Sequence, residues 1–153
     1  MLIFYCCYGR AHSSVTAAAL HLGQLSSPRS SAIFNLPYFD QATTYDIGIP
    51  KLVGRDLCGN SVFILGCGPA KSLVKEVLRT VLLNHGYTRQ DIMFIDLQPH
   101  LNFYTRLGGF LSRRLGLVFP GKQLAAFGIW RSLKKIEICV HHAKQSARLD
   151  ADK

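Results

Sequence analysis

The segment LIFYCCYGRAHSSVTAAALHLG, residues 2–23, decides the fold of this chain. Its first six residues form a short apolar run rich in aromatic and cysteine residues, which is typical of a buried strand. Ser13 and Ser14 stand where a helix cap is preferred, and Gly23 follows the helical residues as a stop. The segment therefore predicts a strand, a tight loop and a short helix.

The rest of the chain continues this alternation. Strand-like runs at 51–55 and 61–65 flank a turn with Gly59 and Asn60 and predict a hairpin. The remaining expected elements are a helix between Pro69 and Gly86, an interior strand at 92–95, a helix at about 101–115, a strand at 124–130 and a helix from 132 to about 148. This order predicts an α/β fold, namely a three-layer α/β/α sandwich with a mainly parallel sheet and one hairpin, P-loop-like or Rossmann-like.

Two apolar rows recur along the helix between Pro69 and Gly86. Because residues four apart lie on one helix face, we expect both rows to face the core. The rows are Leu73, Val77 and Val81, and Val74, Leu78 and Leu82.

Length and composition favour one globular domain over residues 1–153, with 48% hydrophobic and 18% charged residues. Residues 26–50 hold three of the six prolines and are interpreted as a surface excursion, either a lid or a packed loop. No apolar stretch approaches the ~18 residues needed to cross a bilayer. The N-terminus lacks the basic region of a signal peptide, so a cytoplasmic location is expected.

The formal charge of +9 favours an anionic partner, which includes a nucleotide, a nucleic acid or an acidic headgroup. No nucleic-acid-binding motif accompanies the charge. The five cysteines are odd in number and contain no C-x-x-C pair, which favours reduced thiols and gives a metal site no support.

The loop between the first strand and helix is the first candidate site. In an open α/β sheet, ligands bind beyond the carboxyl ends of strands, where the first amides of a helix lack internal partners. The donors offered to a phosphate are Gly9, Arg10, His12, Ser13 and Ser14. Alternatively, a serine only caps the helix while Arg10 and His12 point into water. The loop lacks the second glycine and the lysine of a Walker A sequence.

Cysteines at the strand end offer an alternative chemistry. The low-molecular-weight cysteine phosphatases place a Cys at a strand end, followed by five residues and then Arg and Ser. Here Cys6 is followed by five residues and then His12 and Ser13, so the spacing agrees but the arginine is replaced. Cys6 or Cys7 is then either a nucleophile with a lowered pKa or a buried strand residue.

Two further candidates lie later in the chain. Asp96 ends the strand at 92–95 and is interpreted either as a magnesium ligand or general base, or as the cap of the next turn. Arg106 and Arg113 share a helix face and, with Arg114, either reach a second phosphate or form a solvated basic surface.

Three runs give the chain a resemblance to a bacterial family catalogued as domain of unknown function 3189. They are residues 7–14 (CYGRAHSS), 36–40 (LPYFD) and 108–116 (GGFLSRRLG). Members of the family usually have Gly where this chain has Arg10 and His where it has Cys6. The resemblance implies no assigned activity, and it points to the same loop.

These observations lead to three hypotheses. The first is a phosphate- or nucleotide-binding protein, a degenerate P-loop-like phosphotransferase or NTPase that uses Mg²⁺ with its ligand. The second is a phosphatase-like hydrolase with Cys7 or Cys6 as the nucleophile. The third is a non-catalytic regulatory module that docks through its basic helices.

Overall fold

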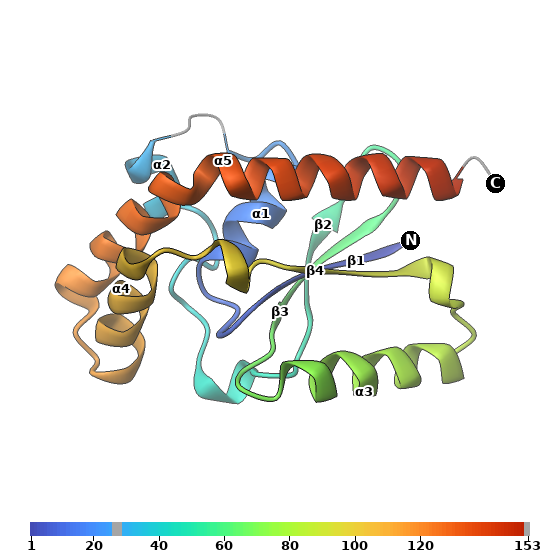
Figure 1. Cartoon of the computed structure of the whole chain (residues 1–153), viewed down its shortest axis with the longest axis horizontal. Coiled ribbons are helices and arrows are strands. Elements are labelled where there is room, and N and C mark those ends of the chain that lie inside the picture. Colours follow the sequence, from blue (N-terminus) through green and yellow to red (C-terminus); the bar gives the residue numbers. More distant parts are fainter. Residues whose placement is uncertain (26–28, 152–153) are drawn as a thin grey trace.

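The computed structural model describes residues 1–25 and 29–151, and Figure 1 gives the arrangement of the elements. The first three residues of the expected excursion, 26–28, lie outside the described residues. The strands are β1 (Leu2–Cys7), β2 (Lys51–Arg55), β3 (Ser61–Gly66) and β4 (Ile92–Asp96). The helices are α1 (Ser13–His21), α2 (Ser30–Phe34), α3 (Lys71–Asn84), α4 (Phe103–Arg114) and α5 (Val118–Ala151), with 3-10 turns η1 (Thr44–Asp46), η2 (Arg89–Asp91) and η3 (Gln98–His100).

The four strands form one mixed sheet in the order β2-β3-β1-β4. β1 pairs in parallel with both β3 and β4, and β2 pairs antiparallel with β3, which confirms the expected hairpin. The 92–95 run is a strand as expected, but it lies at the edge of the sheet and not in its interior. The interior strands are β3 and β1, and the loop that follows β1 opens between the ends of its neighbours β3 and β4.

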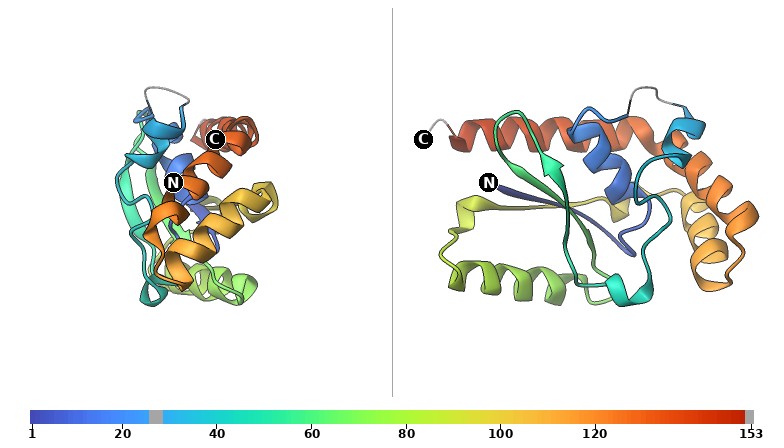
Figure 2. Two further views of the ribbon diagram at one scale, coloured as in Figure 1. Left: turned by 90° about the vertical axis from the view of Figure 1, so that its left-hand side faces the viewer. Right: turned by 180° about the vertical axis from the view of Figure 1, so that it is seen from behind.

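Helices lie against both faces of the sheet, as Figures 1 and 2 show. Ile3 and Tyr5 of β1 belong to a large apolar cluster with α1 and α5, whereas Phe4 belongs to a smaller cluster under α3. On that smaller side the Phe4 ring stacks between the rings of Phe63 and Phe94, at centroid distances of 4.8 and 5.0 Å. Successive side chains of β1 therefore point to opposite faces of the sheet and pack into two separate apolar clusters.

Only one of the two expected apolar rows of α3 faces the sheet. Val74, Leu78 and Leu82 pack against the cluster around Phe4. The expectation for the other row was wrong, because those side chains are about half exposed; they are Leu73, Val77 and Val81. A single helix lying on a sheet buries one stripe, and the neighbouring row turns to solvent.

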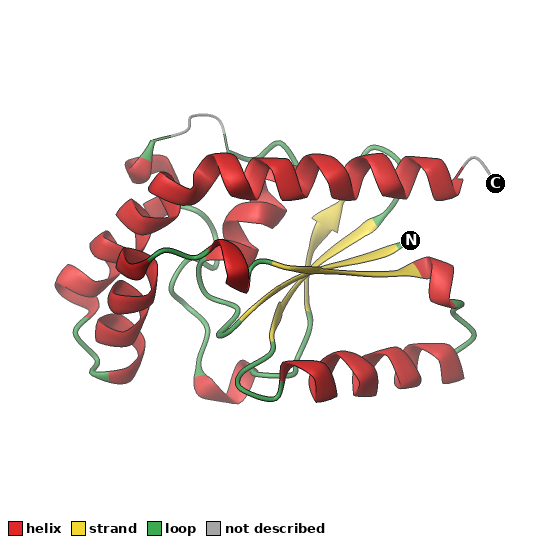
Figure 3. Cartoon of the chain, viewed as in Figure 1, coloured by secondary structure: helices red, strands yellow, loops and turns green. Residues whose placement is uncertain are grey.

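The run at 124–130 is helical and not a strand, which corrects the expected order of elements (Figure 3). It belongs to α5, which also includes the expected final helix and is interrupted by non-helical dihedral angles at Phe119. The buried positions follow a helical repeat of three and four residues; they are Ala125, Ala126, Ile129, Leu133, Ile136 and Val140. The helix expected at about 101–115 is confirmed as α4.

The described part of the 26–50 excursion contributes to the core. Ile33, Leu36 and Phe39 are buried in the cluster shared by α1 and α5. η1 follows and brings the chain back to the sheet, where the Gly48 amide donates to the Gly66 carbonyl (2.8 Å). The segment is thus packed through its middle, with η1 beside the end of β3.

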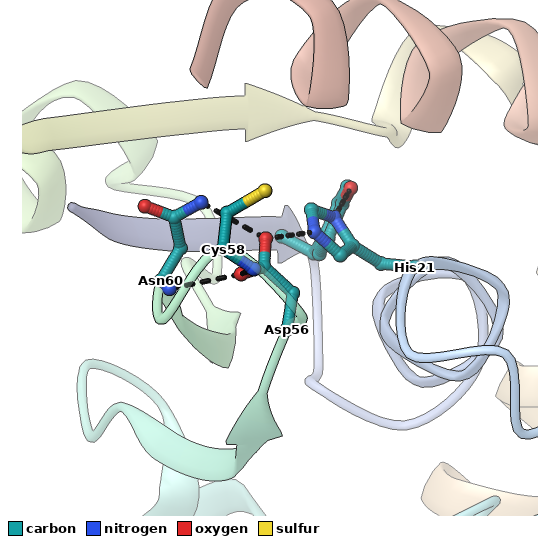
Figure 4. A network of polar contacts seen from close by, with 5 residues as sticks. His21, Asp56, Cys58 and Asn60 are labelled. Carbon is teal, nitrogen blue, oxygen red and sulfur yellow. Dashed lines mark hydrogen bonds and ion pairs between the residues drawn. The ribbon is translucent and has the colours of Figure 1, made fainter. Parts of the chain in front are cut away.

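A buried polar network joins the C-terminal end of α1 to the β2–β3 hairpin (Figure 4). The Tyr5 hydroxyl lies 2.7 Å from His21 Nδ1, and His21 Nε2 lies 3.0 Å from Asp56 Oδ2. Asp56 also accepts hydrogen bonds from the amides of Cys58 and Asn60. Burial lowers the pKa of His21, so its neutral ring donates from Nε2 to Asp56 and accepts from Tyr5.

Within residues 1–25 and 29–151, no helix combines the length and apolar character needed to span a membrane.

Candidate functional site

The loop from Tyr8 to His12 lies at the carboxyl end of β1, close to the end of β3. The amides of Cys67 and Gly68 donate to the carbonyls of Cys7 (2.8 Å) and Tyr8 (2.9 Å). Gly66 permits this close approach, because a Cβ there would lie 3.1 Å from the backbone of Gly9 and Arg10. The loop is therefore fixed by its backbone, with the start of α1 held just beyond the sheet.

The amides at the start of α1 have no internal acceptors. The first backbone hydrogen bond of the helix runs from the Thr16 amide to the His12 carbonyl (3.0 Å). Within the described part of the chain, the amides of residues 9–15 donate to no other backbone group, and no side chain caps the helix. Unpartnered amides and the helix dipole together favour an anion at this position.

Ser13 adds an unpartnered hydroxyl to these amides. Its side chain is 1% exposed, and its Oγ is the one buried side-chain oxygen or nitrogen without a hydrogen-bond partner among the described residues. Ser14 differs, since its Oγ lies 3.1 Å from Cys7 Sγ. A buried hydroxyl without a partner costs free energy, which a ligand oxygen at this site would recover.

A cavity of about 590 Å³ opens in front of this loop. Its walls come from the β1–α1 loop, from η1 and its flanks, from the segment after β4, and from one face of α4. The α4 face contributes Thr105, Arg106, Gly109, Phe110, Arg113 and Arg114. No Asp or Glu is among the described residues that line it, so the arginines give the cavity lining a net positive charge.

His12 lines this cavity, and its ring forms a hydrogen bond with Asp40. His12 Nε2 lies 2.9 Å from Asp40 Oδ1, and the Ser112 hydroxyl donates to the other carboxylate oxygen. The Asp40 backbone is fixed as well, because its amide donates to the Ala11 carbonyl (2.9 Å) and its carbonyl accepts from Arg113 (3.0 Å). Asp40 thus connects the loop to α4.

The charge of Asp40 sets the tautomer of His12. Burial alone would raise the pKa of Asp40, but hydrogen bonds from His12 and Ser112 outweigh it and lower the pKa below its ordinary value. An ionised carboxylate only accepts, so His12 Nε2 carries the proton that it donates. Nδ1 makes no hydrogen bond in the described structure. It is the ring nitrogen that is left free to take a hydrogen-bond partner.

Gly109 allows α4 to lie against the His12 ring. A Cβ at Gly109 would come within 3.2 Å of His12 Cε1 and 3.4 Å of Nδ1. A larger residue here would press on the ring that lines the cavity. Gly109 of the Gly108-Gly109 pair thus has a packing role at this face of α4.

Arg10 belongs to the loop but does not line the cavity. Its guanidinium donates to the Ile49 carbonyl (2.8 Å) and to Asp46 (2.6 Å). Its backbone is in the left-handed region, with φ of 58°, where glycine is favoured. The side chain therefore joins the loop to η1.

Asp96 and Cys6 also lie outside the cavity lining. Asp96 Oδ2 is 2.5 Å from Lys71 Nζ and 3.9 Å from Lys75 Nζ. Burial would raise the pKa of Asp96, but the hydrogen bonds from Lys71 and the Gln98 amide lower it. Cys6 is buried on the α3 side of the sheet, whereas Cys7 lines the cavity.

The structure therefore brings Gly9, His12 and Ser13 of the loop together with the arginines of α4, as the cavity lining shows. The residues that sequence reasoning missed are Asp40 and Ser112. Asp40 lies in the second run of the family resemblance, and Ser112 lies in the third. These runs were the signal by which the sequence could have pointed to the two residues. Among the described residues no group of three or more His, Cys, Asp or Glu side chains is placed to hold a metal ion.

These features define an α/β protein with a cationic cavity at the start of its first helix. The chain belongs to the family described as protein of unknown function, DUF3189, whose sequence model matches residues 2–145. All three runs of the resemblance contribute to this one site. No curated protein and no solved structure matches the chain.

Proposed function

We propose that the protein binds a phosphate-bearing small molecule, with the phosphate at the N-terminus of α1. The observation that carries the proposal is the buried, unpartnered Ser13 hydroxyl beside amides that also lack acceptors. Phosphate oxygens accept hydrogen bonds from both kinds of donor. The helices on the two faces of the sheet favour a three-layer, P-loop-like or Rossmann-like arrangement, in which ligands bind beyond the strand ends.

The charges of the cavity support the same ligand. Arg106 and Arg114 line it and make no ion pair in the described part of the chain. A dianionic phosphate would neutralise them without displacing an existing carboxylate partner. Asp96 has no role in this proposal, because Lys71 and Lys75 already neutralise it.

Replacing Ser13 by alanine tests the proposal. Because the hydroxyl has no partner in the free protein, S13A should leave the free energy of unfolding unchanged or raise it by up to about 1 kcal/mol. The same change should weaken phosphate binding about tenfold, the value of one hydrogen bond to a charged group. Isothermal titration with inorganic phosphate and nucleotides, with and without Mg²⁺, gives the affinity, and urea unfolding gives the stability.

The matched control is Ser146→Ala, since Ser146 is an exposed serine on α5. It should change neither quantity. A loss of stability in S13A with unchanged phosphate affinity would assign Ser13 a structural role and refute the proposed site.

A second candidate function is a cysteine-dependent phosphatase with Cys7 as the nucleophile. It is favoured by one observation: Cys7 is among the residues that line the cavity, and its Sγ lies 3.1 Å from the Ser14 hydroxyl, which could donate to a thiolate. The thiolate would form a sulfur–phosphorus bond as the ester oxygen leaves, and water would then release phosphate.

Alkylation separates the two functions. If Cys7 is a nucleophile, iodoacetamide should modify it faster than the buried Cys67, and phosphate should slow the reaction at Cys7. Peptide mass spectrometry follows each site, and the exposed Cys58 serves as the control whose rate phosphate leaves unchanged. A slow reaction at Cys7 leaves binding alone as the proposed function.

A further inference from the structure

The cavity is larger than a phosphate needs, and its second half is chemically different from its first. At about 590 Å³ it falls within the ~300–1,000 Å³ range of pockets that enclose whole small molecules. A phosphate on the α1 amides would fill only a small part of it. The remaining space must therefore determine what the phosphate is attached to.

Aromatic side chains face that remaining space. Phe110 and Tyr8 line the cavity and are 48% and 51% exposed, and Ile47 and Leu101 add apolar surface beside them. A half-exposed phenylalanine ring in a cavity wall gains free energy when a second flat ring covers it. The wall therefore favours a planar aromatic group.

The neighbours of Phe110 on α4 strengthen this preference. Arg106 precedes Phe110 by four residues and Arg114 follows it by four, so the three share one helix face and line one cavity. At ~1.5 Å of rise per residue, the Cα atom of each arginine lies about 6 Å from that of Phe110 along the helix. Guanidinium groups stack on aromatic rings and pair with phosphates, so this stripe suits a ring that carries a phosphate.

We infer that the ligand is a nucleoside monophosphate, with its phosphate on the start of α1 and its base on the Phe110 face of α4. The inference rests on the proposed phosphate site and adds the substrate class to it. The cavity volume favours a ligand with a sugar between the phosphate and the ring over a smaller aryl phosphate.

The test compares AMP, ribose 5-phosphate, phenyl phosphate and inorganic phosphate by isothermal titration. The wild-type protein should bind AMP about tenfold or more tightly than ribose 5-phosphate, the usual effect of stacking one base on an aromatic side chain. Phe110→Leu keeps an apolar side chain but removes the ring. It should bring AMP down to the affinity of ribose 5-phosphate and leave ribose 5-phosphate unchanged.

Phe103→Leu is the matched control, because Phe103 is an exposed phenylalanine of the same helix that does not line the cavity. It should leave both affinities at the wild-type value, and circular dichroism should show that both variants are folded. Equal affinities of wild-type protein for AMP and ribose 5-phosphate would overturn the inference while the phosphate site stands. Tighter binding of phenyl phosphate than of AMP would also overturn it, and no binding of any phosphate compound would refute the proposed function itself.

Discussion

Asp40 determines how the polar wall of the cavity is assembled. One carboxylate oxygen faces His12, the other accepts from Ser112, and the backbone carbonyl accepts from Arg113. These partners are 28, 72 and 73 positions away in the sequence. No local spacing rule relates residues so far apart, so sequence patterns could identify His12 as a candidate but not the carboxylate behind it.

Asp40→Asn should keep the tautomer of His12 but weaken its hydrogen bond. The amide oxygen of asparagine can still accept from Nε2 while the amide nitrogen faces the Ser112 hydroxyl, but the acceptor loses its charge, so the ¹⁵N shift of Nε2 should change. The ¹⁵N chemical shifts of the two ring nitrogens, measured above pH 8, distinguish the tautomers directly. We also expect phosphate affinity to change, because His12 lines the cavity. Identical ring shifts in wild type and variant would contradict the assigned hydrogen bond.

Asp56 should make the protein sensitive to acid. Burial would raise its pKa, but hydrogen bonds from Asn60 and His21 and from nearby amides lower it to about 2 from the ordinary 3.8. A carboxyl whose pKa is lower in the folded chain stabilises the protein above its ordinary pKa, and this contribution is lost as the pH falls through the folded value. The contribution at pH 6 is about 2 kcal/mol.

Urea unfolding between pH 6 and pH 2 checks this expectation. Asp56→Asn should reduce the fall in stability over that range by about 2 kcal/mol relative to wild type. Glu137→Gln is the control, since Glu137 is an exposed carboxyl on α5 with no ion pair in the described structure. The same pH dependence in wild type and D56N would show that the network of Figure 4 contributes no linked protonation.

At the scale of elements, α4 and α5 approach each other through glycines. A Cβ at Gly108 would lie 2.3 Å from the Ala125 amide nitrogen, and one at Gly128 would lie 2.3 Å from that of Thr105. Gly121 meets the backbone of Ser112 in the same way, at 2.6 Å. Backbone atoms cannot rotate aside as a flexible side chain can, so the spacing of the two helices depends on these positions.

Gly108→Ala should destabilise the protein although alanine is the better helix former. The propensity gain is about 1 kcal/mol, whereas forcing a methyl group into closely packed backbone costs up to about 3 kcal/mol. We therefore expect a net loss of about 2 kcal/mol in the free energy of unfolding, and the same sign for Gly128→Ala. Gly9→Ala adds the same methyl where nothing lies within 4 Å and should leave the stability nearly unchanged. A stabilised G108A would show that the helices separate easily.

Local sequence patterns predicted most of the elements but not all of their places. The first strand, the hairpin, α3 and α4 follow from apolar runs, glycine turns and helix stops. The run at 124–130 was wrongly expected to be a strand, because LAAFGIW is apolar almost throughout and short apolar runs do not distinguish strand from helix. The edge position of β4 could not be predicted either, since its residues are as apolar as those of an interior strand.

At the scale of the whole molecule, a net charge of +9 attracts anions to the protein in general. Anion binding in the cavity must therefore be distinguished from this non-specific attraction. Arg106→Gln should weaken phosphate binding about fivefold at low salt, because it removes an unpaired charge from the lining. Arg89→Gln changes the net charge equally on η2, outside the cavity lining, and should have little effect.

Titrations in 50 mM and 500 mM salt complete that comparison. Screening should reduce the difference between R106Q and wild type at the higher concentration. Equal losses in R106Q and R89Q would mean that the overall charge, and not the cavity, captures the anion.

The glycine contacts between α4 and α5 also have a consequence for how specificity could change. Because no side chain separates the two helices there, added bulk at those positions would move α4 and every arginine it carries. The dimensions of the cavity are therefore governed by glycines that do not line it. Variation in the shape of this cavity between members of the family could arise far from the loop at the start of α1.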